Sequence, residues 1–149
     1  MELGDRIRSV LDYKGWGASS IASDRTVLEA LQKMAAEGVG ALVVVDGEAL
    51  AGMFSERDYA RKVILEGRSS RDALVREIMT ADVITVTPDE TVDRCMHLMT
   101  EHRIRHLPVM VGARVAAMIS QGDLVKWIIS RQSETIAQLQ HYISGGYLR

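Results

Sequence analysis

The sequence has little of what marks secreted, membrane-spanning or nucleic-acid-binding proteins. Its single cysteine, Cys95, has no partner for a disulfide within the chain. Wholly apolar runs such as 41–45 reach about five residues, far short of a membrane span. The formal net charge of -2 gives no basic field to attract nucleic acid or an acidic membrane. No apolar segment of a secretory signal follows Met1, so we expect a cytoplasmic protein.

Aromatic residues (5%) and prolines (two) are also scarce, yet the composition is that of an ordinary globular protein. Apolar residues make up 47% of the chain and charged residues 26%, which argues against disorder. A chain of 149 residues forms one domain or two small ones and is long enough to bury a core.

What the sequence does contain is an internal repeat. Residues 20–64 align with residues 85–129 at a constant offset of 65 without a gap, and twelve of the 45 positions are identical. Internal self-similarity of this kind fixes the architecture. One unit of this length buries too little apolar surface to fold alone, so we expect the two units to pack together as a pseudo-twofold module.

Each unit predicts the same order of elements, β-α-β-β-α. Apolar residues at i, i+3, i+4 and i+7 predict a first helix from Thr26 in one unit and from Thr91 in the other. Short apolar runs predict buried strands on either side of a glycine-containing turn. A second helix is predicted to begin near Arg57 and near Gly122.

Two further amphipathic helices are predicted outside the repeat, at 2–13 and 133–143, the second ending before Gly145-Gly146. The predicted fold class is α/β (α+β), with two β-α-β-β-α repeats and extra terminal helices. The predicted parts are an N-terminal helix and lead-in at 1–18, a first domain at 19–67, a linker at 68–82, a second domain at 83–131, and a C-terminal helix and tail at 132–149.

Paired β-α-β-β-α units that each end a strand with Ser-x-x-Asp resemble a tandem of CBS domains, known as a Bateman module. The resemblance implies adenine-nucleotide binding between the paired units, dimerisation through the helices, and no catalysis. It covers nearly the whole chain and is carried by "RIRHLPVM" (103–110) and "AMISQGDLVK" (117–126), and, as in small stand-alone bacterial CBS-pair proteins, by "GMFSERDYARKV" (52–63), "VREIMTADVITVTPDETV" (75–92) and "QLQHYI" (138–143).

The Ser-x-x-Asp pairs, Ser55 with Asp58 and Ser120 with Asp123, suggest a division of roles. A strand that runs into a helix leaves unpaired N–H groups, which attract an anion such as phosphate. The serine hydroxyls and the charge of Arg57 suit the phosphate. The carboxylates would repel phosphate but can accept hydrogen bonds from the two hydroxyls of a ribose. The alternative is a capping box without any ligand, and the two interpretations are compatible.

An adenine base would need a flat apolar slot at the edges of the first and second strands. The alternative is that Val39 and Ile104 pack in the core and do not contact a ligand. By the resemblance we place Arg105 near a phosphate, while Arg103 stays open between this and a solvated surface charge. Because Arg105 stands where the first unit has Gly40, we expect one arginine in each cleft. The candidates are Ser20, Ala22, Val39, Gly40 and Ala41 in the first unit and Thr85, Thr87, Ile104, Arg105, His106 and Pro108 in the second.

Two other constellations of reactive side chains are set aside. His97, His102 and His106 could suggest a metal site. His97 and His102 are five residues apart on one helix and do not share a face, so no metal site is predicted. Ser120, His106 and Asp123 do not form a catalytic triad, because the aspartate follows the serine on its own helical turn. No catalytic residue is predicted, and Cys95 is expected in the core.

The sequence therefore predicts a non-catalytic regulatory module. Its expected effector is an adenosine nucleotide, with AMP first and ATP, ADP or NAD(H) as alternatives, and no cofactor is required. A homodimer is expected, without nucleic acid or membrane as a partner, and the sequence does not name the protein that is regulated. The alternative is a protein-interaction scaffold with degenerate clefts, and an enzyme is the third hypothesis.

Overall fold

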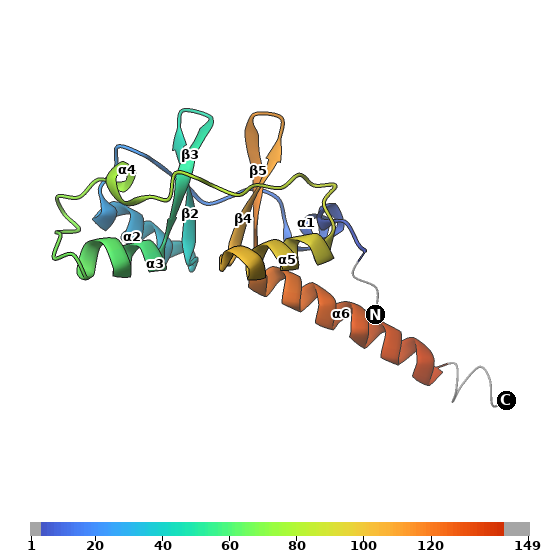
Figure 1. The fold of residues 1–149 in the computed structure, drawn as a ribbon. Coiled ribbons are helices and arrows are strands. Elements are labelled where there is room, and N and C mark those ends of the chain that lie inside the picture. Colours follow the sequence, from blue (N-terminus) through green and yellow to red (C-terminus); the bar gives the residue numbers. More distant parts are fainter. Residues whose placement is uncertain (1–3, 142–149) are drawn as a thin grey trace.

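The computed structural model describes residues 4–141. Two β-hairpins stand side by side, and the long helices lie along one side of them (Figure 1). The first repeat consists of β1 (Ser20–Ala22), α2 (Val27–Glu37), β2 (Ala41–Asp46), β3 (Ala49–Ser55), α3 (Glu56–Tyr59) and a π-helical turn, η1 (Ala60–Ile64). The second consists of α5 (Val92–His102), β4 (His106–Val111), β5 (Arg114–Ser120) and α6 (Gln121–His141). Before each repeat lies a short helix, α1 (Ile7–Lys14) or α4 (Val75–Ile78).

The predicted repeat and its β-α-β-β-α order are confirmed. The bounds of α5, β4 and β5 are those of α2, β2 and β3 shifted by 65 residues. Strand β1 pairs in parallel with β2, which pairs antiparallel with β3, and β4 pairs antiparallel with β5. In the second repeat the counterpart of β1 is reduced to one parallel bridge between Val86 and Val109.

The first long helix of each repeat begins at a threonine cap. In α2 the Thr26 hydroxyl accepts from the Glu29 N–H at 3.2 Å, and the Glu29 carboxylate accepts from the Thr26 N–H at 3.3 Å. In α5 the Thr91 hydroxyl accepts from the Arg94 N–H at 3.1 Å. The caps fix where each helix leaves the loop and hence how its apolar face meets the sheet.

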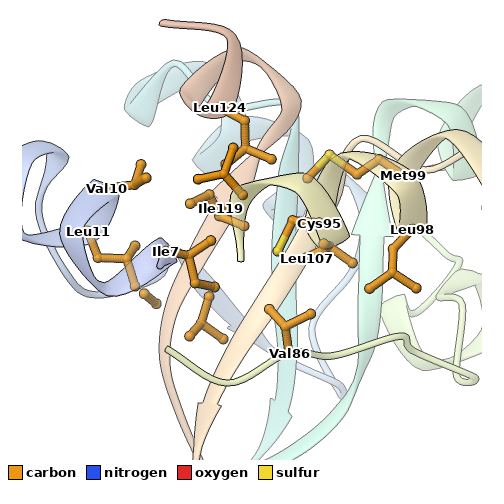
Figure 2. Packing of buried hydrophobic residues seen from close by; sticks show 13 residues of the cluster. Ile7, Val10, Leu11, Val86, Cys95, Leu98, Met99, Leu107, Ile119 and Leu124 are labelled. Atoms are coloured by element: carbon orange, nitrogen blue, oxygen red, sulfur yellow. The ribbon is translucent and has the colours of Figure 1, made fainter. Parts of the chain in front are cut away.

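The core of the second repeat includes helix α1, which precedes the first repeat. Ile7, Val10 and Leu11 are buried among residues of α5, β4, β5 and α6 (Figure 2). The backbone holds this helix in place, because the Ile7 N–H donates to the Glu90 carbonyl at 2.9 Å.

The core of the first repeat in turn includes helix α4 from the linker. Val75 and Ile78 are buried with Phe54 and the apolar face of α2. The Val75 N–H donates to the Arg25 carbonyl at 2.8 Å, and the Val27 N–H donates to the Ala73 carbonyl at 2.9 Å. We call α1 and α4 the crossing segments, because α1 precedes the first repeat but completes the second, and α4 completes the first.

A third buried cluster joins the two hairpins. Ala41 and Val43 of β2 and Met53 of β3 are buried with Met118 of β5. Met53 also pairs with the linker through Thr80, with N–H to carbonyl distances of 2.9 Å in both directions. The repeats are therefore packed as one module around a pseudo-twofold axis.

Helix α6 is longer than the sequence pattern suggested. The helix predicted at 133–143 continues α6 without a break, and residues 142–143 and Gly145-Gly146 lie outside the described residues. Residues 131–141 are all exposed, and Figure 1 shows α6 running away from the repeats. Within residues 4–141, no helix combines the length and apolar character needed to cross a membrane.

Candidate functional site

A cleft of about 500 Å³ lies between the repeats, where the start of α3 faces the start of β4. It brings together seven of the predicted site residues from both repeats and adds residues of the linker. It is lined by Gly40, Met53, Ser55, Glu56, Arg57, Asp58, Thr80, Asp82, Val83, Ile84, Ile104, Arg105 and His106.

Ser55 and Asp58 form a reciprocal cap at the start of α3. The Ser55 hydroxyl accepts from the Asp58 N–H at 3.3 Å, and the Asp58 Oδ2 accepts from the Ser55 N–H at 3.0 Å. The capping alternative is therefore realised in the geometry, while both side chains still line the cleft. Capping fixes the carboxylate at one place on the cleft wall.

The second oxygen of Asp58 is also held. Its Oδ1 accepts from the Thr80 hydroxyl at 3.0 Å and lies 3.1 Å from Lys62 Nζ. The residue is 7% exposed. Burial of a carboxylate requires such partners, because an unpaired charge in the interior is costly.

The arginines require a correction to the expectation of one per cleft. Arg57 and Arg105 line the same cleft, because the docking of the repeats places the start of β4 opposite α3. Arg57 Nη1 donates to the Arg103 carbonyl at 2.7 Å and so reaches from the first repeat to the C-terminal end of α5. A cation at that helix end is favourable because the helix dipole is negative there.

His106 of the second repeat approaches the first repeat within the cleft. A Cβ atom at Gly40 would lie 3.9 Å from the His106 ring and 3.8 Å from the Glu56 carboxyl, so these three residues meet. Burial lowers the pKa of His106, and the nearby carboxylates of Asp123 and Glu56 oppose the shift. The lowered pKa favours the neutral imidazole, which can both donate and accept a hydrogen bond.

The apolar wall of the cleft was largely missed from the sequence. Val83 and Ile84 follow directly after the linker, Met53 belongs to β3, and Ile104 lies in the loop before β4. Of these only Ile104 had been a candidate. Val83 and Ile84 lie within the family-like segment 75–92, but nothing in their local pattern places them beside Asp58.

Gly52 allows the linker to approach the sheet. A Cβ atom at this position would lie 2.7 Å from the Thr80 carbonyl oxygen and 2.7 Å from the Met79 sulfur. Only glycine fits so close to another backbone. The position therefore helps to hold Thr80 within reach of Asp58.

The second Ser-x-x-Asp pair has a different environment. Asp123 Oδ2 accepts from the Ser120 N–H at 2.8 Å, and the Ser120 hydroxyl accepts from the Asp123 N–H at 3.0 Å. Lys14 Nζ from α1 donates to the same Asp123 oxygen at 2.7 Å and to the Met118 carbonyl at 2.8 Å. Burial raises the pKa of Asp123, but the hydrogen bond and charge of Lys14 and the hydrogen bonds of Ser120 outweigh it, leaving the pKa below its usual value.

The remaining predicted residues do not line the cleft described above. Val39 borders a shallower hollow of about 360 Å³ beside α2. Ala41 and Pro108 are buried in the strands, and the Ser20 carbonyl accepts from Lys33 Nζ. Ala22, Thr85 and Thr87 are exposed.

The described residues offer little for metal or thiol chemistry. In the part of the chain between residues 4 and 141, no group of three or more His, Cys, Asp or Glu side chains could hold a metal ion. Cys95 is fully buried in the core, as predicted, and burial raises the pKa of its thiol to about 12.

Comparison with known proteins gives consistent matches. The family model described as "CBS domain" matches residues 19–65 and 75–130. The mitochondrial CBS domain-containing protein CBSX3 of Arabidopsis thaliana is 43% identical over 150 aligned positions, which cover 95% of this chain and 73% of that protein.

Solved structures agree in fold over most of the chain. A putative signal-transduction protein with CBS domains from Burkholderia ambifaria is 46% identical, with a TM-score of 0.82 over 86% of this chain and 96% of that one. A CBS-domain-containing protein from Agrobacterium tumefaciens is 35% identical, with a TM-score of 0.78 over 82% of this chain and 98% of that one.

Proposed function

Because the chain belongs to the CBS-domain family and carries two CBS domains in tandem, we propose that it is a non-catalytic regulatory module that binds an adenosine nucleotide between its repeats. AMP is the first candidate, followed by ATP, ADP and NAD(H). The observation that supports this most is the convergence of Ser55, Asp58 and two arginines on one cleft of about 500 Å³. That volume suits a small-molecule ligand.

Each part of a nucleotide has a counterpart in this cleft. Arg57 and Arg105 supply positive charge and planar donors for phosphate oxygens. Asp58 is fixed by its cap and accepts from ribose hydroxyls. Val83 and Ile84 form part of an apolar surface against which the base stacks. The nucleotide would thus lie with its phosphates toward the arginines.

Regulation would follow from the position of the cleft. Its lining comes from both repeats and the linker, so a bound nucleotide contacts all three. A ligand shifts a conformational equilibrium by as much as its affinities for the two states differ. Nucleotide binding would therefore favour one arrangement of the repeats, which a partner protein reads.

The second Ser-x-x-Asp pair is proposed as a weaker or closed site. Lys14 already occupies the oxygen of Asp123 that also closes the cap, at 2.7 Å. Asp58 also has a lysine partner, Lys62 at 3.1 Å, but Asp58 lines the cleft of about 500 Å³ and Asp123 does not. We therefore propose one nucleotide per chain, in the cleft that Asp58 lines.

Calorimetric titration with AMP, ADP, ATP, NAD⁺ and NADH tests the proposal. One of them should bind with a stoichiometry of one per chain. The absence of binding for all of them at millimolar concentration would rule the nucleotide function out and favour the scaffold alternative. Mass spectrometry of ligand carried through purification separates the same two hypotheses, and turnover of the bound nucleotide would indicate an enzyme.

We further propose a homodimer in the cytoplasm. The equivalent residues Ile64 and Ile129 are 56% and 55% exposed, so both repeats present the same apolar side chain on their helical side. Sedimentation equilibrium should give twice the mass of the chain. The relative from Arabidopsis thaliana is named as mitochondrial, so cell fractionation is the test of the compartment for this chain.

A further inference from the structure

A row of solvent-exposed apolar side chains runs along α6. Val125, Ile129, Ile136 and Leu139 are 40%, 55%, 55% and 57% exposed. When Gln132 is included between Ile129 and Ile136, the successive intervals along the sequence are four, three, four and three residues. This alternation is the seam of a coiled coil, where the apolar positions recur every 3.5 residues. We call these five residues the α6 seam.

Among residues 4–141, the second half of α6 touches the rest of the protein at its start, where Arg131 meets Asp5, and is otherwise exposed. All residues from 131 to 141 are exposed, and the helix points away from both repeats (Figure 1). A helix segment of about this length is marginal in water without packing on one face. The sequence continues the same spacing at Ile143, which lies outside the described residues. A partner along the seam would stabilise this half of the helix.

We propose that α6 pairs with α6 of a second copy as a parallel two-stranded coiled coil. The proposal rests on the homodimer proposed above and names a contact surface on α6, which includes Ile129 but not Ile64. In a parallel pair Gln132 faces Gln132 of the other copy, and an amide offers both the donor and the acceptor that its equivalent needs. In an antiparallel pair Gln132 would face an apolar seam residue instead. A single polar layer of this kind fixes register and orientation.

The positions beside the seam favour an identical partner. Charged residues at these positions usually decide which helices pair. Here they are Lys126, Ile128, Ser133, Thr135 and Gln140, of which Lys126 alone is charged. Two identical helices therefore meet without rows of like charge.

The body of the protein leaves room for the pair. Leu124 and Trp127 face the second repeat, and the Trp127 Nε1 donates to Asp5 at 3.0 Å. Arg131 lies 3.4 Å from the same carboxylate. At 3.6 residues per turn, the seam lies roughly a third of a turn from this side. A twofold axis along the seam therefore places the two bodies on opposite sides of the helix pair.

Substitution on and beside the seam tests the pairing in the full chain. Ile136→Lys places a charge in the apolar layer and should halve the mass in sedimentation equilibrium at micromolar concentration. Ala137→Lys adds the same charge at the next residue, which lies outside the α6 seam, and should leave the dimer intact. A dimer that survives Ile136→Lys overturns the proposal. A native chain that sediments as a monomer overturns both this pairing and the homodimer.

Orientation is tested by cross-linking. Leu139→Cys should form a disulfide with itself across a parallel pair upon oxidation. The native chain is the control, because Cys95 is buried and should not cross-link. A Leu139→Cys dimer that does not cross-link overturns the parallel arrangement. Nucleotide titration of the Ile136→Lys monomer reports on the cleft separately, so loss of the dimer and loss of the binding function are distinguished.

Discussion

Asp58 and Asp123 occupy equivalent positions in the two repeats, and their neighbours differ. Both close a cap on the serine three residues before them. Asp58 lines the cleft and is held by Thr80 and by Lys62 of its own helical segment. Asp123 is held instead by Lys14, which comes from α1. Sequence identity at these positions thus does not imply equal availability to a ligand.

Asp58→Asn should weaken nucleotide binding. The substitution keeps an oxygen for the cap and removes the charge that accepts from the ribose. Loss of one charge-assisted hydrogen bond of roughly 1.5–3 kcal/mol lowers affinity by about 10- to 100-fold. Calorimetric titration measures it, with Asp123→Asn as the matched control that should bind as the native chain does. Equal affinities for Asp58→Asn and the native chain would remove Asp58 from the site.

Lys14→Ala should open the second site. Without the lysine, Asp123 has an oxygen free of its ion pair, and the stoichiometry should rise from one nucleotide per chain to two. Lys14→Arg keeps the ion pair and should stay at one. Titration of the three proteins decides the matter, and two nucleotides on the native chain would show that Lys14 does not close the site.

The sequence could indicate Ser55 and Asp58 because both belong to one local turn whose chemistry is visible in four residues. The sequence could not indicate Lys14, which lies 109 residues from Asp123. It could not place both arginines in one cleft either, since that depends on how the repeats dock. Local motifs therefore predicted polar residues that line the cleft, and long-range packing determined which other residues join them.

At the scale of elements, the two equivalent helices α2 and α5 end in the same backbone conformation with different residues. Gly38 follows α2 at φ 66°, and Arg103 follows α5 at φ 55°. Among residues 4–141, Arg103 is the one non-glycine residue with positive φ. Its carbonyl accepts from Arg57, which helps to hold this left-handed conformation.

Arg103→Gly should stabilise the protein. The left-handed conformation costs a residue with a Cβ atom roughly 1–2 kcal/mol, and the flexibility of glycine in the unfolded chain offsets part of this gain. The free energy of unfolding in urea should therefore rise by about 0.5–1 kcal/mol. Gly38→Arg is the reverse change at the equivalent position and should lower it. A loss of stability in Arg103→Gly would mean that its side chain contributes more than the backbone strain.

The order and approximate bounds of the elements could be predicted because the repeat shows each pattern twice. The continuity of α6 could also have been predicted, since residues 123–144 contain neither glycine nor proline. The sequence of η1 does not predict a π-helical turn, because its five residues are equally typical of an α-helix. Short elements of this kind are decided by packing and not by pattern.

At the scale of the whole molecule, the crossing segments make the two repeats depend on each other. Helix α1 completes the core of the second repeat and α4 completes that of the first. We expect one cooperative unfolding transition, because opening one repeat releases a segment that is continuous with the other.

Ile7→Ala tests this dependence. Ile7 is fully buried in the core of the second repeat. Its truncation should lower the free energy of unfolding by about 2–5 kcal/mol and keep a single transition. Ser9→Ala on the exposed side of the same helix is the control and should change little. Separate transitions of the two repeats in urea would contradict the expectation.

The crossing segments also bear on how such a chain is inherited. The stretch that recurs in the sequence is 45 residues long, but a gene fragment that encodes one copy does not encode a folding unit. A crossover in the loop between Leu65 and Ala73 would separate α1 from the repeat that it completes. Recombination between related genes would therefore be expected to exchange both repeats together, so that the two repeats are inherited as one unit.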